Sequence, residues 1–296
     1  ELEPERAEAD NVIADLTTAA ERLREQAPAL PDEEAEEAEE AVEIGPVPLE
    51  PRIVPAAQRG AEPWLSESIA RLAAADPELA GRLVLTLLPV QRLRAVADVV
   101  YDVTVTGLGS FRVSVRAANA TVEPVAEPGG AEFHVAGTAA ELAEFAAGGI
   151  DRRPPRSILV RGSRRRLKRL TRKLREPVQL ADLARAGAVS EPGLILAALA
   201  AGVDPEWTAG HRFTVAWIVE GAYGGTWTIA VGDGALEVRT GLPEEGAGAT
   251  LHVPQPMFVA LLAGFATAPG LRATAEGDAH TVDLVRQWFD RVQRLG

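Results

Sequence analysis

The chain contains no cysteine, only four histidines and few aromatic residues. Without cysteine it has no disulfide, no thiolate metal ligand and no cysteine nucleophile. The histidines His134, His211, His252 and His280 are scattered along the sequence, without the spacing of a zinc site, and neither a Gly-x-Ser-x-Gly elbow nor a P-loop is present. We therefore expect that the protein is not an enzyme, and we expect no catalytic residue, no metal and no cofactor.

Long hydrophobic runs are also missing. The longest, Gly193 to Val203, is far shorter than the ~18 apolar residues that predict a transmembrane helix. The first residues lack the basic start and apolar stretch of a secretory signal, so we expect a cytoplasmic protein. The net charge of −13 argues against general nucleic-acid binding.

The 296 residues are too many for one ordinary domain. Apolar residues at helical spacing predict an N-terminal helix within residues 1–27. Residues 28–63 are rich in Pro, Glu and Ala and predict a disordered acidic linker. Two domains follow, at residues 64–180 and 190–296.

Both domains show the same order of helical and strand-like patterns. Strands are predicted from alternating apolar residues at 99–105, 111–115, 120–124, 131–136 and 157–160, and again at 213–219, 227–231, 236–238, 249–253 and 271–276. Helices are predicted at 64–75, 78–97, 138–147 and 164–175, and again at 193–201, 256–263 and 281–292. We predict an α+β fold of two tandem modules, each a predominantly antiparallel five-stranded sheet covered by helices.

Individual residues support the tandem repeat. Phe133-His134-Val135 in the first copy corresponds to Leu251-His252-Val253 in the second, and Gly148 corresponds to Gly264. A collinear series of such matches over about eighty residues is not expected by chance.

The second copy resembles the sterol carrier protein 2 (SCP2) family. The resemblance lies in Asp204-Pro205-Glu206-Trp207-Thr208-Ala209-Gly210, in Trp227 to Val231 before the turn Gly232-Asp233-Gly234, in Ala249 to Val253 and in Glu276-Gly277-Asp278. It implies binding or transfer of a sterol, fatty acid or acyl lipid in a pocket between sheet and helices. The first copy departs from the pattern, because Ala117-Ala118-Asn119 replaces the Gly-Asp-Gly turn and its last helix is strongly basic.

Four of the five tryptophans lie in the second copy, which makes it the better candidate for an apolar ligand site. The alternative is that these side chains fill a solid core, as aromatic residues at strand and helix spacing usually do. The candidate ligand-binding residues are Trp217, Val219, Trp227, Ile229, Phe258, Leu261, Leu262, Phe265, Trp288 and Phe289.

The first copy ends in a basic amphipathic helix with a narrow apolar stripe. Such a face suits anionic lipid headgroups or a protein partner, and without interleaved aromatic residues nucleic acid is a weaker candidate. The alternative is a solvated cover, or a counterpart to the acidic residues of the linker. The candidate anionic-surface docking residues are Arg164, Arg165, Arg166, Lys168, Arg169, Arg172 and Lys173.

Three functions remain open from the sequence. The first is a lipid-binding protein whose second domain holds a hydrophobic small molecule. The second is a structural or interaction protein with solid modules, whose residues 1–63 and basic helix recruit a macromolecular partner or an anionic membrane. The third is an accessory domain pair that works beside a separately encoded enzyme.

Overall fold

The computed structural model describes residues 47–49, 63–93, 98–116, 119–150, 158–172, 174–186, 191–264 and 272–295. All of these residues belong to one compact unit. The helix expected within residues 1–27 and nearly all of the linker expected at 28–63 therefore lie outside the described residues.

Two helices begin the first module, α2 (Trp64–Ala75) and α3 (Pro77–Leu87), followed by a 3-10 helix (Leu88–Leu93). They are separated at Asp76, which lies in the gap between the predicted helices 64–75 and 78–97. The Asp76 carboxylate accepts a hydrogen bond from the Leu79 N–H at 2.9 Å, so it caps α3 while Pro77 occupies the first helical turn.

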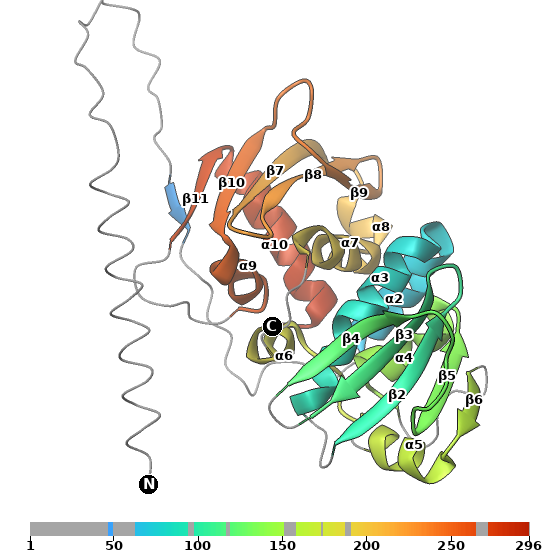
Figure 1. Ribbon diagram of the computed structural model, residues 1–296. Coiled ribbons are helices and arrows are strands. Elements are labelled where there is room, and N and C mark those ends of the chain that lie inside the picture. The colour runs from blue at the N-terminus through green and yellow to red at the C-terminus, as the bar shows by residue number, and fades with distance from the viewer. Residues whose placement is uncertain are drawn as a thin grey trace, which may run out of the picture. The chain divides into compact units, whose positions relative to one another are not determined.

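The first sheet lies beside these helices (Figure 1). Its strand order is β4-β3-β2-β5-β6, with a parallel pair between β2 and β5 and antiparallel pairs elsewhere. The strands are β2 (Val99–Val105), β3 (Gly109–Val115), β4 (Ala120–Val125), β5 (Phe133–Gly137) and β6 (Leu159–Gly162).

The second sheet repeats this order as β9-β8-β7-β10-β11, again with one parallel pair, between β7 and β10. A sixth strand, β1 (Val47–Leu49), pairs antiparallel with β11 at the edge. Part of the segment expected to be linker is therefore a strand. The other strands are β7 (Arg212–Glu220), β8 (Gly225–Gly232), β9 (Ala235–Thr240), β10 (Ala249–Pro254) and β11 (Ala273–Gly277).

The remaining helices follow the strands in both modules. In the first they are α4 (Ala139–Ala147), α5 (Arg164–Thr171) and α6 (Leu180–Arg185). In the second they are α7 (Pro192–Gly202), α8 (Pro205–Thr208), α9 (Gln255–Leu262) and α10 (Ala279–Gln293). The basic helix is shorter than the predicted 164–175. The strand before it lies two residues later than predicted.

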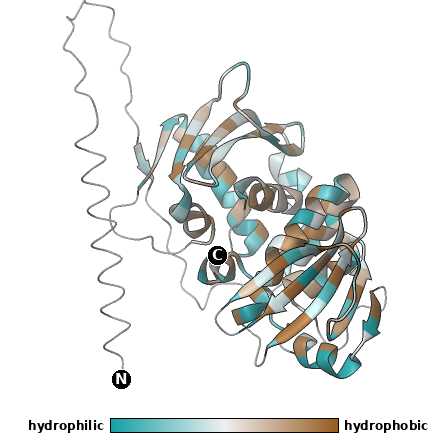
Figure 2. Cartoon of the chain, viewed as in Figure 1, coloured by the Kyte–Doolittle hydropathy of each residue, from teal (hydrophilic) through white to brown (hydrophobic). Residues whose placement is uncertain are grey.

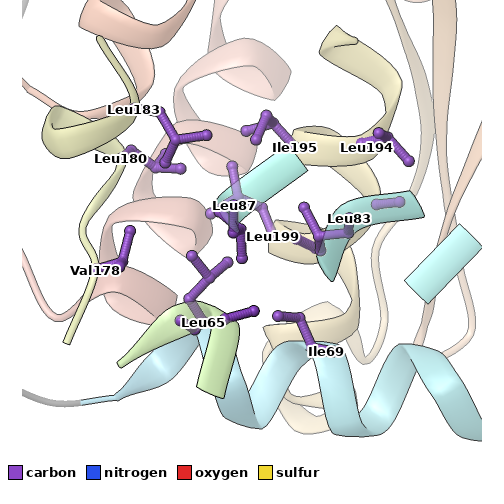
Figure 3. Packing of buried hydrophobic residues seen from close by; sticks show 14 of the residues in the cluster. Leu65, Ile69, Leu83, Leu87, Val178, Leu180, Leu183, Leu194, Ile195 and Leu199 are labelled. Atoms are coloured by element: carbon purple, nitrogen blue, oxygen red, sulfur yellow. The ribbon is translucent and has the colours of Figure 1, made fainter. Parts of the chain in front are cut away.

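One hydrophobic core joins the two modules. Helix α2 packs against α4 of the first module and α7 of the second. Figure 3 shows leucine and isoleucine side chains from α2, α3, α6 and α7 meeting in this core, among them Leu65, Leu87, Leu183 and Leu199. Burying each such side chain stabilises the fold by about 1.5–3 kcal/mol, so the shared core couples the two modules.

The predicted α+β class with two mainly antiparallel sheets is confirmed. The parallel pairs β2–β5 and β7–β10 were not anticipated. They arise because the chain crosses from the β4 or β9 edge to the opposite side of β2 or β7. Among the helices that the structure describes, none is long and apolar enough to cross a bilayer.

Candidate functional site

The interior residues expected to bind a ligand form the core of the second module. Nine of them are described, and all nine are at most 6% exposed. Phe265 lies outside the described residues. The nine are Trp217, Val219, Trp227, Ile229, Phe258, Leu261, Leu262, Trp288 and Phe289.

These side chains pack on one another. The ring of Trp217 meets that of Phe258 edge-on at 5.9 Å, and Trp288 stacks on Phe213 at 6.0 Å. No group in the part of the chain that the structure describes accepts a hydrogen bond from the buried indole Nε1 of Trp217, which is uncommon for a buried polar atom. The contacts are those of a packed core, the alternative that the sequence left open.

A surface cleft lies between the two modules. We call it the α3–α7 cleft, and its volume is about 570 Å³. It is bounded by α3, the start of α7, the β7–β8 turn and β8, so it exists only because the shared core brings α3 against α7. Its lining consists of Arg82, Leu85, Thr86, Glu191, Leu194, Tyr223, Gly224 and Trp227.

Close packing sets the position of Trp227 in this cleft. Gly193, in the first turn of α7, has no side chain, and the indole of Trp227 occupies the space that a Cβ would need. Pro192 begins the helix, where its missing N–H costs nothing. The edge of the ring therefore forms part of the wall, although Trp227 is 6% exposed.

An ion pair closes one side of the cleft. The Arg82 guanidinium donates a hydrogen bond to the Glu191 carboxylate, and both side chains are 46% exposed. Tyr223 is 58% exposed, and its backbone N–H donates to Gln255 Oε1 at 3.1 Å. The α3–α7 cleft thus combines an apolar wall, Leu85, Leu194 and Trp227, with a guanidinium that solvent reaches.

A second cleft, of about 470 Å³, lies on the other side of the same helix turn and shares Leu85 and Thr86. Its wall is formed by Phe111, Val122 and other residues of the first module. Arg92 borders it, and its guanidinium donates to the Ala186 carbonyl at 2.6 Å. That arginine holds the chain after α6 in place.

The outer face of the first sheet carries an ion pair between a buried carboxylate, Asp102, and a half-buried guanidinium, Arg112. Asp102 is 0% exposed and accepts hydrogen bonds from Arg112 at 2.9 and 3.2 Å and from the Gly129 N–H at 2.7 Å. Arg112 also donates to the Gly129 carbonyl, and the adjacent carboxylate raises the pKa of Arg112. This pair fastens the loop that crosses from β4 to β5, so we assign it a structural role.

His134 lies beside that pair. Its Nε2 is 2.8 Å from Thr104 Oγ1, which is 2.7 Å from Ser110 Oγ. Partial burial lowers the pKa of His134 and outweighs the opposing influence of Asp102, while Arg161 lowers it further. His252 in the second module lies near Glu220 instead, at 3.8 Å.

Five of the predicted docking residues, Arg164, Arg165, Arg166, Lys168 and Arg169, lie on α5, and Arg172 is its C-cap. Leu167 and Leu170 are buried, which directs the basic side chains outward. Arg166 pairs with Glu132 at 2.8 Å. Lys173 lies outside the described residues, and the exposed residues are Arg164, Arg165, Arg166, Lys168, Arg169 and Arg172.

Metal ligands are not clustered in the part of the chain that the structure describes, where no three His, Asp or Glu side chains come close enough to hold an ion. Sequence reasoning did not identify Arg82 and Glu191 as site residues. They are 109 positions apart, and no periodic pattern connects them.

A protein-family model, the alkyl sulfatase C-terminal family, matches residues 184–294, less than half of the chain. No curated protein matches the chain. One similar solved structure is the stereoselective inverting sec-alkylsulfatase Pisa1 from Pseudomonas sp., with 17% identity over 40% of this chain and 21% of that one, and a TM-score of 0.29. A double mutant of PisA1 gives 20% identity over 41% and 21%, with a TM-score of 0.30.

The chain spans about a fifth of the length of these alkylsulfatase structures. The family match overturns the resemblance to the SCP2 family, and with it the predicted sterol or lipid carrier. The matched range contains the whole second module from α7 to α10. Residues 184–294 are therefore similar to the C-terminal region of alkyl sulfatases.

Proposed function

We propose that this chain is a sulfatase-related, non-catalytic protein that recognises an alkyl sulfate ester at the α3–α7 cleft. The observation that carries the proposal is the family match, because five of the eight residues lining the cleft lie inside residues 184–294. The other three come from α3 of the first module. The site is a charged surface cleft, distinct from the interior pocket expected from the sequence.

The lining offers one surface for each part of such a molecule. The alkyl chain lies against Leu85, Leu194 and the indole edge of Trp227. Each methylene removed from water contributes about 0.8 kcal/mol. The sulfate group lies at Arg82, whose planar guanidinium presents two N–H donors to two sulfate oxygens.

Glu191 opposes this binding. Its carboxylate already accepts a hydrogen bond from Arg82 and repels a second anion. A bound sulfate must share the guanidinium with that carboxylate or replace it. The proposal therefore requires opposite effects of the two partners: neutralising Arg82 weakens binding, and neutralising Glu191 strengthens it.

The role is binding rather than hydrolysis because of the chemistry of the lining. Its ionisable groups are Arg82, Glu191 and Tyr223, and the first two are paired with each other. Cleavage of a sulfate ester by water needs an activated nucleophile and a group that stabilises the leaving oxygen. The proposal assigns neither task to these three residues.

The test measures binding of 2-octyl sulfate to the full chain by isothermal titration calorimetry, with 2-octanol as the uncharged comparison. Arg82→Gln should weaken binding roughly tenfold or more, because a hydrogen bond to a charged group contributes about 1.5–3 kcal/mol. Glu191→Gln should tighten binding. Arg239→Gln is the matched control, because Arg239 is also an exposed arginine paired with a glutamate, Glu237, but lies on β9 away from the cleft.

Two results would overturn the proposal. One is equal binding of 2-octanol and 2-octyl sulfate, which would show that the sulfate is not recognised. The other is release of inorganic sulfate by the purified chain, which would show that the protein is an enzyme.

The cytoplasmic location expected from the sequence remains a prediction, to be checked by cell fractionation.

A further inference from the structure

The strongest concentration of charge in the chain lies outside the α3–α7 cleft. Residues 152–175 include twelve of the thirty lysines and arginines and no acidic residue, in a chain whose net charge is −13. Eight of these basic residues are exposed on β6, on α5 and just after it, and one of them, Arg166, pairs with Glu132. We call the other seven the α5 basic face: Arg161, Arg164, Arg165, Lys168, Arg169, Arg172 and Arg175.

The fold holds these side chains on the outside. Ser163 caps α5 by accepting the Arg166 N–H at 3.4 Å, and Leu167, Leu170 and Leu174 are buried beneath the helix. The apolar stripe of α5 is thus part of the protein core and cannot insert into a membrane. Figure 2 shows mostly hydrophilic colouring on this helix, beside the edge strand β6.

Few of the described basic side chains on α5 form an ion pair with an acidic residue of the same protein. Arg166 pairs with Glu132, but no ion pair within the described residues involves Arg164, Arg165, Lys168 or Arg169. Mutual repulsion of these like charges is unfavourable until an anionic surface approaches. The acidic remainder of the chain orients the protein, since a negative surface attracts this face and repels the others.

We propose that the α5 basic face docks the protein on an anionic lipid surface. Docking is electrostatic and superficial, because the apolar side of the helix is already buried. Leu159 supports a lipid surface over a nucleic acid: it is 51% exposed on β6, on the same outer side of the sheet as Arg161. The basic face also lacks aromatic side chains on which bases could stack, and it follows a helix surface instead of a groove.

The experiment is co-sedimentation of the full chain with vesicles. One set contains phosphatidylcholine alone, and the other contains phosphatidylcholine and phosphatidylserine in equal parts. We expect binding to the second set only, and loss of that binding at high salt because the charges are screened.

The test variant is the triple substitution Arg165→Gln, Lys168→Gln, Arg169→Gln. Binding should weaken on the order of a hundredfold, since each basic residue near an anionic surface contributes roughly a fivefold increase in affinity. The control variant removes the same charge from three exposed arginines of the second module, Arg212→Gln, Arg239→Gln and Arg272→Gln, and should bind as well as the unmodified chain. Circular dichroism confirms that both variants are folded.

Equal loss of vesicle binding in both triple variants would overturn the proposal, because it would reflect net charge alone. Absence of binding to phosphatidylserine vesicles would also overturn it. A labelled double- or single-stranded oligonucleotide that binds the full chain more tightly than the vesicles would identify a nucleic acid as the partner instead. Binding of 2-octyl sulfate at the α3–α7 cleft should be unchanged in the test variant, so the two proposals stand or fall separately.

Discussion

Gly193 and Trp227 pack so closely that a Cβ on Gly193 would overlap the indole nitrogen of Trp227, with two further ring carbons at 3.1 Å. The contact joins the first turn of α7 to β8 at the wall of the α3–α7 cleft. It explains why a glycine is present near the start of a buried helix, where it otherwise lowers helix stability by up to about 1 kcal/mol.

Gly193→Ala should therefore destabilise the protein. The gain in helix propensity is outweighed by displacement of a rigid indole in a packed core, which typically costs 1–3 kcal/mol. Urea denaturation of both proteins measures the difference. Gly232→Ala is the control, since a Cβ there meets nothing within 4 Å and the backbone conformation suits alanine. Equal stability of the two variants would contradict the overlap.

Tyr101 and Gln91 form a buried polar chain in the first module. The Tyr101 hydroxyl donates to Gln91 Oε1 at 2.7 Å, and Gln91 Nε2 donates to the Phe145 carbonyl at 2.9 Å. Burial raises the pKa of Tyr101, so the hydroxyl stays protonated. Tyr101→Phe should lower the free energy of unfolding by about 1 kcal/mol, and Gln91→Leu should lower it further because both hydrogen bonds are lost. A larger decrease in melting temperature for Tyr101→Phe than for Gln91→Leu would contradict the two hydrogen bonds of Gln91.

Asp102 fastens the loop from β4 to β5 through Arg112 and Gly129. Asp102→Ala should destabilise the protein by about 1.5–3 kcal/mol, because the Gly129 N–H and the half-buried Arg112 guanidinium lose the carboxylate that they bind. In the second module Thr228 has a comparable task, with its hydroxyl donating to the Gly241 carbonyl at 2.7 Å. Thr228→Val removes one neutral hydrogen bond and should cost only about 1 kcal/mol. A similar loss of unfolding free energy for the two substitutions would show that the charge of Asp102 adds nothing to the stability of the protein.

His134 should make stability depend on pH. Burial lowers its pKa below the ordinary value of 6.5, so the unfolded chain binds more protons than the folded chain between the two values. Stability should therefore fall as the pH drops from about 7.5 to about 5. Urea denaturation across this range should give a flatter profile for His134→Asn than for the unmodified chain. An unchanged or steeper profile for the variant would contradict the direction of the shift.

The strands were predictable because inward and outward residues alternate along them. Val99–Val105 was predicted with its observed bounds, and the alternation in β7 and β8 correctly marked both strands.

The family was not predictable in the same way. Gly232-Asp233-Gly234 forms a turn in which Asp233 and Gly234 have φ values of 51° and 85°, and Asp204 caps α8. Such residues are required by turns and helix starts in any sheet of this strand order, so they do not distinguish one family from another.

The sequence by itself determined the order of helices and strands, their repetition in two modules and the outward basic side chains of α5, since each depends on residues near one another in the chain. Only the tertiary structure decided that Trp217 and Trp288 fill a core, that β1 extends the second sheet and that Arg82 meets Glu191. The physical reason is that these features depend on how distant segments pack. A pattern of apolar residues predicts that a side chain is buried, but not whether its neighbour across the core is another side chain or a ligand.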